Sequence, residues 1–254
     1  MQTQPSLDEA ADRLERNAAI AGVVPAVLVG VLLVFVQPVI GVVVGVLLAV
    51  GWVVAIRGRI AAAPLLVLAS MPSEPLAPGS QPRLENLLEG LGVTSGVAEL
   101  DVALVDSAAL NALVAVGRGR PRVLLTTALV EHLDRLELEG VLANLLGRVK
   151  DGSARYSTTV LALLGSSPRA TKMLASHLGE QRSVLSDLAA VDLTRYPPGL
   201  MSALSTMAEH GTELREVPPS TGPLWLAPAV PSASGDQGAE FQPLSLRIAV
   251  LAEL

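Results

Sequence analysis

The sequence predicts an α+β protein, mainly α, in which an N-terminal transmembrane helical hairpin precedes a domain with a small antiparallel sheet. Half of the residues are hydrophobic and the mean hydropathy is +0.51, more apolar than an ordinary soluble protein. Residues 18–56 contain no charged side chain. After residue 82 the apolar residues instead follow the helical and alternating periods of a folded domain. We therefore expect a polar leader (1–17), the hairpin (18–56), a membrane-proximal segment with a linker (57–82) and the domain (83–254).

The uncharged stretch is too long for one transmembrane helix, because the hydrocarbon core needs only about 20 residues per span. Gln37 and Pro38 lie in its middle and can turn the chain. We expect two spans in the lipid bilayer, residues 18–36 and 39–56. The acidic leader and the length of the apolar stretch argue against a cleaved signal peptide. A buried hairpin of a soluble protein is the remaining alternative.

Positive charges flank the hairpin on both sides. Arg13 and Arg16 precede it, and Arg57 and Arg59 follow it. Because such residues stay on the cytoplasmic side, we expect an inner-membrane protein with both termini and the domain in the cytosol. Small residues recur every four positions on both spans, where they would allow close packing within the hairpin or contact with another membrane protein. They are Gly22, Ala26, Gly30, Gly41, Gly45 and Ala49.

The composition excludes several classes of function. The net charge of −6 gives no basic surface for nucleic acid. The chain has no cysteine, which excludes disulfides and thiolate zinc ligands. Aromatic residues make up only 2% of the chain, too few for a platform that stacks bases.

The remaining segments alternate between helices, short strands and loops. Residues 60–68 predict a helix on the bilayer surface, and the proline-rich residues 71–82 predict a linker. Alternating apolar residues and the turn residues 117–121 predict three strands. The expected strands are 100–105, 114–116 and 122–126, the expected helices are 83–95, 168–192, 197–215 and a closing helix, and residues 218–238 are the expected long loop.

The segment from Asp134 to Asp151 predicts the central helix of the domain. Asp134 and Glu137 form a capping-box pattern before an apolar run at helical spacing. Asn144 and Arg148 are four residues apart and therefore project from one face. This is the frame of the His-Glu-x-x-His zinc helix, but none of its functional positions carries the residue that the chemistry requires.

Four segments in order resemble the membrane-embedded zinc metallopeptidases of the HtpX-like family. Residues 111–118 are similar to the family's Asn-Ala-x-Ala-x-Gly segment, and residues 129–143 to its approach to the zinc helix. Residues 182–189 resemble the Arg-x-x-Glu-Ala-Asp element, and residues 241–251 the closing Pro-Leu-x-x-Arg-Ile segment. The resemblance implies a zincin-like domain at the end of the membrane hairpin.

The resemblance also implies roles for single positions. The zinc ligands of the family would fall on Asn144, Arg148 and Leu185, and its general base on Leu145. These side chains cannot coordinate zinc or activate water, so we expect no metal, no cofactor and no catalysis. Asp187 is the retained position that supports the metal ligands. We hypothesise that Arg148 enters the vacated cavity and pairs with Asp187. The alternative is that Arg148 reaches solvent and Asp187 caps its own helix.

The groove beside the metal helix is the candidate binding site. Family peptidases hold an extended substrate against an edge strand, and an unpaired edge accepts a peptide without catalysis. The alternative is that the loop 218–238 covers this edge. The corresponding residues here are Asn111, Ala112, Leu113, Val114, Ala115 and Val116.

The expected function is that of a membrane-anchored, inactive peptidase homologue, a pseudoenzyme that binds or regulates a membrane protein, a protease or a peptide. The first alternative is an active, divergent zinc endopeptidase in membrane protein quality control, with His132 as its best remaining ligand. The second is a structural membrane subunit. The oligomeric state does not follow from the sequence.

Overall fold

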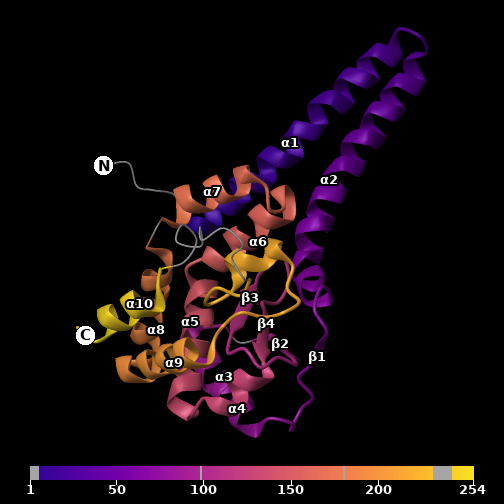
Figure 1. The fold of residues 1–254 in the computed structure, drawn as a ribbon. Coiled ribbons are helices and arrows are strands. Elements are labelled where there is room, and N and C mark those ends of the chain that lie inside the picture. Colours follow the sequence, from indigo (N-terminus) through magenta and orange to yellow (C-terminus); the bar gives the residue numbers. More distant parts are fainter. Residues whose placement is uncertain (1–5, 98, 180, 231–241) are drawn as a thin grey trace.

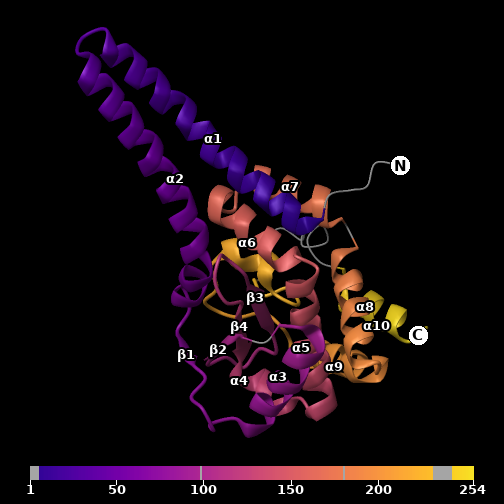
Figure 2. The ribbon, with the colours of Figure 1, turned by 180° about the vertical axis from the view of Figure 1, so that it is seen from behind.

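The computed structural model describes residues 6–97, 99–179, 181–230 and 242–254. A long helical hairpin projects from a helical domain that encloses a small sheet (Figure 1). Helix α1 (Leu7–Val34) and helix α2 (Pro38–Ala69) form the hairpin. They run side by side away from the domain in both views (Figure 2). Both helices are long and apolar enough to cross a membrane.

Glycines bring the two hairpin helices into close contact. A Cβ atom on Gly30 would lie 2.9 Å from the Cα atom of Gly45, so a larger residue would force the helices apart. The outward faces are apolar and exposed, as lipid-facing surfaces are; Leu32 is 68% exposed and Leu47 is 64% exposed. The small residues therefore serve the packing of the hairpin itself.

Both helices extend beyond the expected spans. The described part of the leader belongs to α1, and residues 60–68 continue α2 instead of forming a separate surface helix. That part of the prediction was wrong because the lower part of α2 packs on the domain. Ile60 and Ala63 are buried, and a Cβ atom on Gly117 would lie 2.8 Å from the carbonyl oxygen of Ile60.

The sheet is mixed, in the order β1-β2-β4-β3. Its strands are β1 (Ser73–Pro75), β2 (Asp101–Val105), β3 (Ala112–Ala115) and β4 (Arg122–Thr126). The β3–β4 hairpin is antiparallel as expected, but it places β4 beside β2 in parallel orientation, which corrects the expected antiparallel sheet. Strand β1 lies in the predicted linker, and its three residues are too few to show alternation.

Helices surround the sheet and one another. The predicted helix 168–192 is two helices, because the chain turns at Gly179 with a positive φ of 75°. The expected loop 218–238 contains a short 3₁₀ helix, while its residues 231–238 lie outside the described part. The elements are α3 (Pro82–Ser95), α4 (Thr127–His132), α5 (Arg135–Lys150), α6 (Ser153–Leu164), α7 (Pro168–Leu178), α8 (Arg182–Thr194), α9 (Pro197–His210), η1 (Pro219–Leu224) and α10 (Leu244–Leu251).

Helix α5 is the centre of the domain. Its capping box is formed: the Asp134 side chain accepts from the Glu137 amide at 2.8 Å, and the Glu137 side chain accepts from the Asp134 amide at 2.8 Å. From Leu138 to Arg148 nearly every side chain is buried, because α3, α6, α8 and α9 pack around it. A Cβ atom on Gly140 would lie 2.8 Å from the Cα atom of Leu200 on α9. The helix that carries the candidate site is therefore held on several sides.

Candidate functional site

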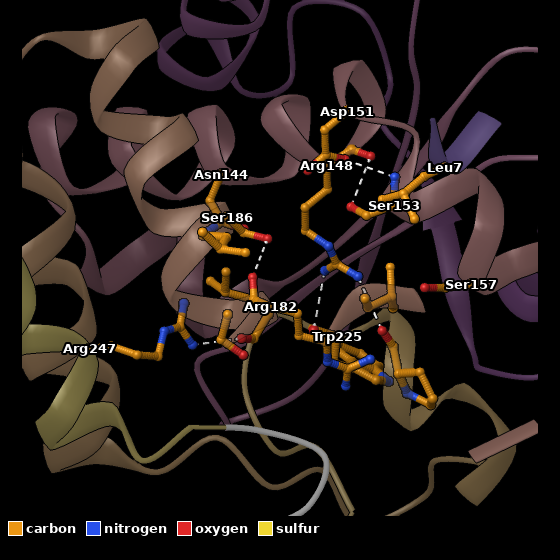
Figure 3. A pocket seen from close by; sticks show the side chains of 15 residues that line it. Leu7, Asn144, Arg148, Asp151, Ser153, Ser157, Arg182, Ser186, Trp225 and Arg247 are labelled. Carbon is orange, nitrogen blue, oxygen red and sulfur yellow. Dashed lines mark hydrogen bonds between the residues drawn. The ribbon is translucent and has the colours of Figure 1, made fainter. Parts of the chain in front are cut away.

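A cavity of about 80 Å³ lies where α5, α6, α8 and residues 223–226 meet. Asn144 and Arg148 line it from α5, as their spacing of four residues predicted, and Figure 3 shows Arg148 extending toward Trp225. A cavity of this volume is large enough to hold water. Leu145 lies outside this lining, in the hydrophobic core.

The inward face of α8 differs from the predicted one. Leu185 borders the cavity but is 55% exposed, so its side chain is turned toward solvent. Ser183 lines the same cavity and is 7% exposed. It lies one helical turn before the buried Asp187 and shares its face. On α8 the buried residues Ser183 and Asp187 therefore face inward, whereas Leu185 is turned toward solvent.

Arg148 donates hydrogen bonds to three successive backbone carbonyl groups. Its Nη2 atom donates to the carbonyl oxygen of Pro223 at 3.1 Å, and its Nη1 atom donates to those of Leu224 at 2.9 Å and Trp225 at 3.2 Å. These groups belong to residues 219–229, which we call the strap. Arg148 is only 8% exposed. The strap thus supplies the hydrogen-bond acceptors that a buried guanidinium requires.

The surroundings of Arg148 are rich in positive charge. Burial lowers the pKa of its guanidinium to about 9, and nearby Arg182 and Arg247 lower it as well, whereas Asp151 raises it. The group therefore remains a cation at neutral pH. A divalent metal placed beside it would be repelled by this charge.

Asp187 pairs with Arg247 of α10 and not with Arg148, so the hypothesised pair was wrong. Arg247 donates from Nε and Nη2 to the two carboxylate oxygens, each at 2.7 Å, and from Nη1 to the carbonyl oxygen of Leu226 at 2.8 Å. Asp187 and Arg247 are each 1% exposed. Burial raises the pKa of Asp187, and the hydrogen bonds from Arg247 and Asn144 oppose that rise. Arg247 lies in the closing Pro-Leu-x-x-Arg-Ile segment, and the sequence alone did not indicate it as the partner of Asp187.

Asn144 links the pair of Asp187 and Arg247 to helix α5. Its Nδ2 atom donates to Asp187 Oδ1 at 2.8 Å, which fixes the orientation of the amide, because the flipped group would set two acceptors against each other. Its Oδ1 atom is buried and has no hydrogen-bond partner among the described residues. Asn144 therefore offers one acceptor for a water molecule or another donor.

The edge strand is covered by the strap, as the alternative stated. Leu113 and Trp225 form an antiparallel bridge, and the Leu226 amide donates to the carbonyl oxygen of Ala112 at 2.8 Å. Asn111 Nδ2 donates to the carbonyl oxygen of Ala227 at 3.0 Å. The predicted residues Asn111, Ala112, Leu113, Val114, Ala115 and Val116 are all buried.

The donor set does not fit zinc. Asn144 offers one neutral oxygen, Arg148 is a cation bound to carbonyl groups, and Ser183 is a neutral hydroxyl. Within residues 6–97, 99–179, 181–230 and 242–254, no group of three or more His, Cys, Asp or Glu side chains could hold a metal. His132 faces His210 at 5.3 Å between ring centroids, away from this cavity.

Removing the carboxylate in Asp187→Ala should lower the free energy of unfolding by about 3–5 kcal/mol, because it leaves Arg247 buried without its partner. Asp192→Ala is the matched control on the same helix: its pair with Arg195 is exposed, and its loss should cost at most about 0.5 kcal/mol. Chemical denaturation in detergent measures both. Equal stability of the two variants would contradict a structural role for the buried pair.

A second prediction concerns the inward face of α8. The variant Asn144→His, Leu145→Glu, Arg148→His, Ser183→Glu should gain one zinc ion per chain by elemental analysis, because it places three ligands around one cavity. The matched variant with Leu185→Glu in place of Ser183→Glu should gain none, since that carboxylate points toward solvent. The opposite ranking of the two variants would contradict the assignment of Ser183.

Comparison with known proteins gives one consistent result. No protein-family model matches the chain. A protease HtpX homologue of Tropheryma whipplei is 29% identical over 188 residues, which are 59% of this chain and 64% of that protein. One of Dictyoglomus thermophilum is 26% identical (66% of this chain, 67% of that protein), and one of Listeria monocytogenes is 24% identical (66% and 72%). The chain thus spans slightly less than two thirds of the Tropheryma protein. The chain is thus similar to HtpX protease homologues over about three fifths of its length, and helices α1 and α2 are long and apolar enough to cross a membrane.

Proposed function

We propose that this chain is a catalytically inactive HtpX-like peptidase homologue that binds or regulates a membrane protein, a protease or a peptide. The observation that carries the proposal is the set of hydrogen bonds from Arg148 to three carbonyl groups of the strap. Where a zinc peptidase requires an imidazole ligand, this chain has a buried cation whose donors hold three carbonyl groups of its own backbone. A peptidase mechanism needs a metal-bound water at that place, and these side chains do not supply its ligands.

The edge of β3, which the strap covers, supports the proposed binding of a peptide or protein. The strap lies antiparallel to β3 at Leu113 and Trp225, which is the arrangement by which an added peptide strand binds a sheet edge. Arg148 adds hydrogen bonds to backbone carbonyl groups, and these bonds do not depend on the side chains of the bound segment. A peptide partner in this groove must therefore displace the strap.

The alternatives gain less support. An active zinc enzyme based on His132 lacks a cluster of ligands around that residue in the described part of the chain. A purely structural role for the small-residue face is disfavoured, because Gly30 and Gly45 pack against each other within the hairpin. The arginines that flank the hairpin favour a cytosolic location of both termini and the domain.

A peptide added in trans tests the groove directly. The variant Leu224→Ser, Trp225→Ser, Leu226→Ser weakens the strap's apolar contacts, and a synthetic peptide of residues 219–230 should bind this variant but not the wild-type chain. Fluorescence anisotropy of the labelled peptide measures the affinity.

Adding Arg148→Met to the strap variant should remove most of this binding, because hydrogen bonds to a charged donor contribute about 1.5–3 kcal/mol each. The exposed Arg195→Gln substitution, added to the same strap variant, is the control and should leave the affinity unchanged. If the peptide binds neither the strap variant nor the control, the groove is not a peptide site.

A further inference from the structure

A second cavity lies at the membrane-proximal end of the domain. It has a volume of about 320 Å³ and lies between the lower part of α2, helix α6 and η1. Figure 1 shows α6 beside the lower part of α2. The volume falls within the range of about 300–1,000 Å³ that is typical of ligand pockets. We call it the membrane-proximal cavity.

The walls of this cavity leave few polar groups free. Three of its hydroxyl groups already donate within the chain: Ser70 to Val67 at 2.6 Å, Thr158 to Ala154 at 2.8 Å and Thr221 to Pro218 at 2.8 Å, each to a carbonyl oxygen. Most of the remaining lining is aliphatic, including Ala63, Leu66 and Leu161. The cavity offers no unpaired strand edge to a peptide, and its walls suit an apolar chain.

Arg59 supplies the only charge among the described lining residues. It is exposed, and its Nε atom donates to the carbonyl oxygen of Ala162. Its two terminal nitrogens have no acceptor among the residues that the structure describes, so both can bind an anion. Arg59 follows the uncharged span by three residues, which places it at the level of the lipid headgroups.

The dimensions match one lipid tail. From Arg59 to Ser70 helix α2 rises about 16 Å. One leaflet contributes about 15 Å to the hydrocarbon core, so an acyl chain has a similar length. Leu65 and Leu66, beside the cavity, are 51% and 61% exposed, and α2 continues without a break into the hairpin. Arg57 and Arg59 separate this apolar surface from the membrane span, so a lipid would reach the cavity with its headgroup at these arginines.

We propose that the membrane-proximal cavity binds one acyl chain of an anionic phospholipid, with the lipid phosphate on Arg59. The positive charge at one end and the apolar walls beyond it are complementary to the two parts of such a lipid. Because η1 forms one wall, a bound chain would also cover the outer side of the strap at Leu224.

Native mass spectrometry of the full chain in detergent tests the proposal. The probes are phosphatidylglycerol and phosphatidylcholine with identical acyl chains, added in equal amounts. The wild-type chain should retain one phosphatidylglycerol, and Ala162→Trp, which fills the cavity, should lose it. Arg59→Gln should lower the preference for phosphatidylglycerol about fivefold, the equivalent of about 1 kcal/mol per charge near a membrane surface. Arg195→Gln, at the exposed residue that follows α8, should keep the wild-type preference.

Three mass-spectrometry results would overturn the proposal. The first is equal retention of both lipids by the wild-type chain, and the second is unchanged retention in Ala162→Trp. The third is an adduct of peptide mass that Ala162→Trp removes, since the cavity would then hold a peptide. Inorganic phosphate, which carries the charge without the chain, should not raise the melting temperature as phosphatidylglycerol does, and an equal rise would also contradict the proposal. Arg59→Gln changes an exposed side chain, so it remains informative even if Ala162→Trp does not fold.

Discussion

A buried guanidinium that must satisfy its donors determines the arrangement of this domain. Arg148 is nearly inaccessible to solvent, and its hydrogen bonds go to backbone carbonyl groups of the strap. An unpaired charge at this depth would cost several kcal/mol, so the strap cannot leave without a replacement for those acceptors. The same strap pairs with β3 and closes the edge of the sheet. One side chain on α5 thereby links the central helix to a segment that follows it by about seventy residues.

A second arginine, Arg247, links the strap to α8 and α10. Arg247 bridges Asp187 on α8 and the carbonyl oxygen of Leu226, and Asn144 joins Asp187 to α5. Helices α5, α8 and α10 and the strap are thus connected through hydrogen bonds between buried groups. In a zinc peptidase the metal connects its ligand helices. In this chain Arg148 connects α5 to the strap, and Arg247 connects α10 to α8 and the strap.

The local signals in the sequence predicted the elements that local chemistry controls. The uncharged stretch predicted the hairpin, and Asp134 with Glu137 predicted the start of α5. The spacing of Asn144 and Arg148 placed both side chains on one cavity. The position of Ser183 was also available, since it precedes Asp187 by four residues on a helix, but the motif comparison favoured Leu185.

Contacts between distant residues were not predictable from one sequence. Arg247 and Asp187 are 60 residues apart, and no local pattern distinguishes their pairing from one between Arg148 and Asp187. Strand β1 is defined by its pairing with β2 and not by its own three residues. The orientation of β4 likewise depends on which strand lies beside it. These features arise from packing of the whole domain, which periodicity and propensity do not describe.

We propose that a cation occupies the position of the metal and that the chain does not act as a zinc enzyme. Elemental analysis of the detergent-purified full chain, after exposure to zinc and desalting, tests this proposal most directly. We expect no stoichiometric zinc. One tightly held zinc ion per chain would contradict it, and the search for ligands would then begin at His132.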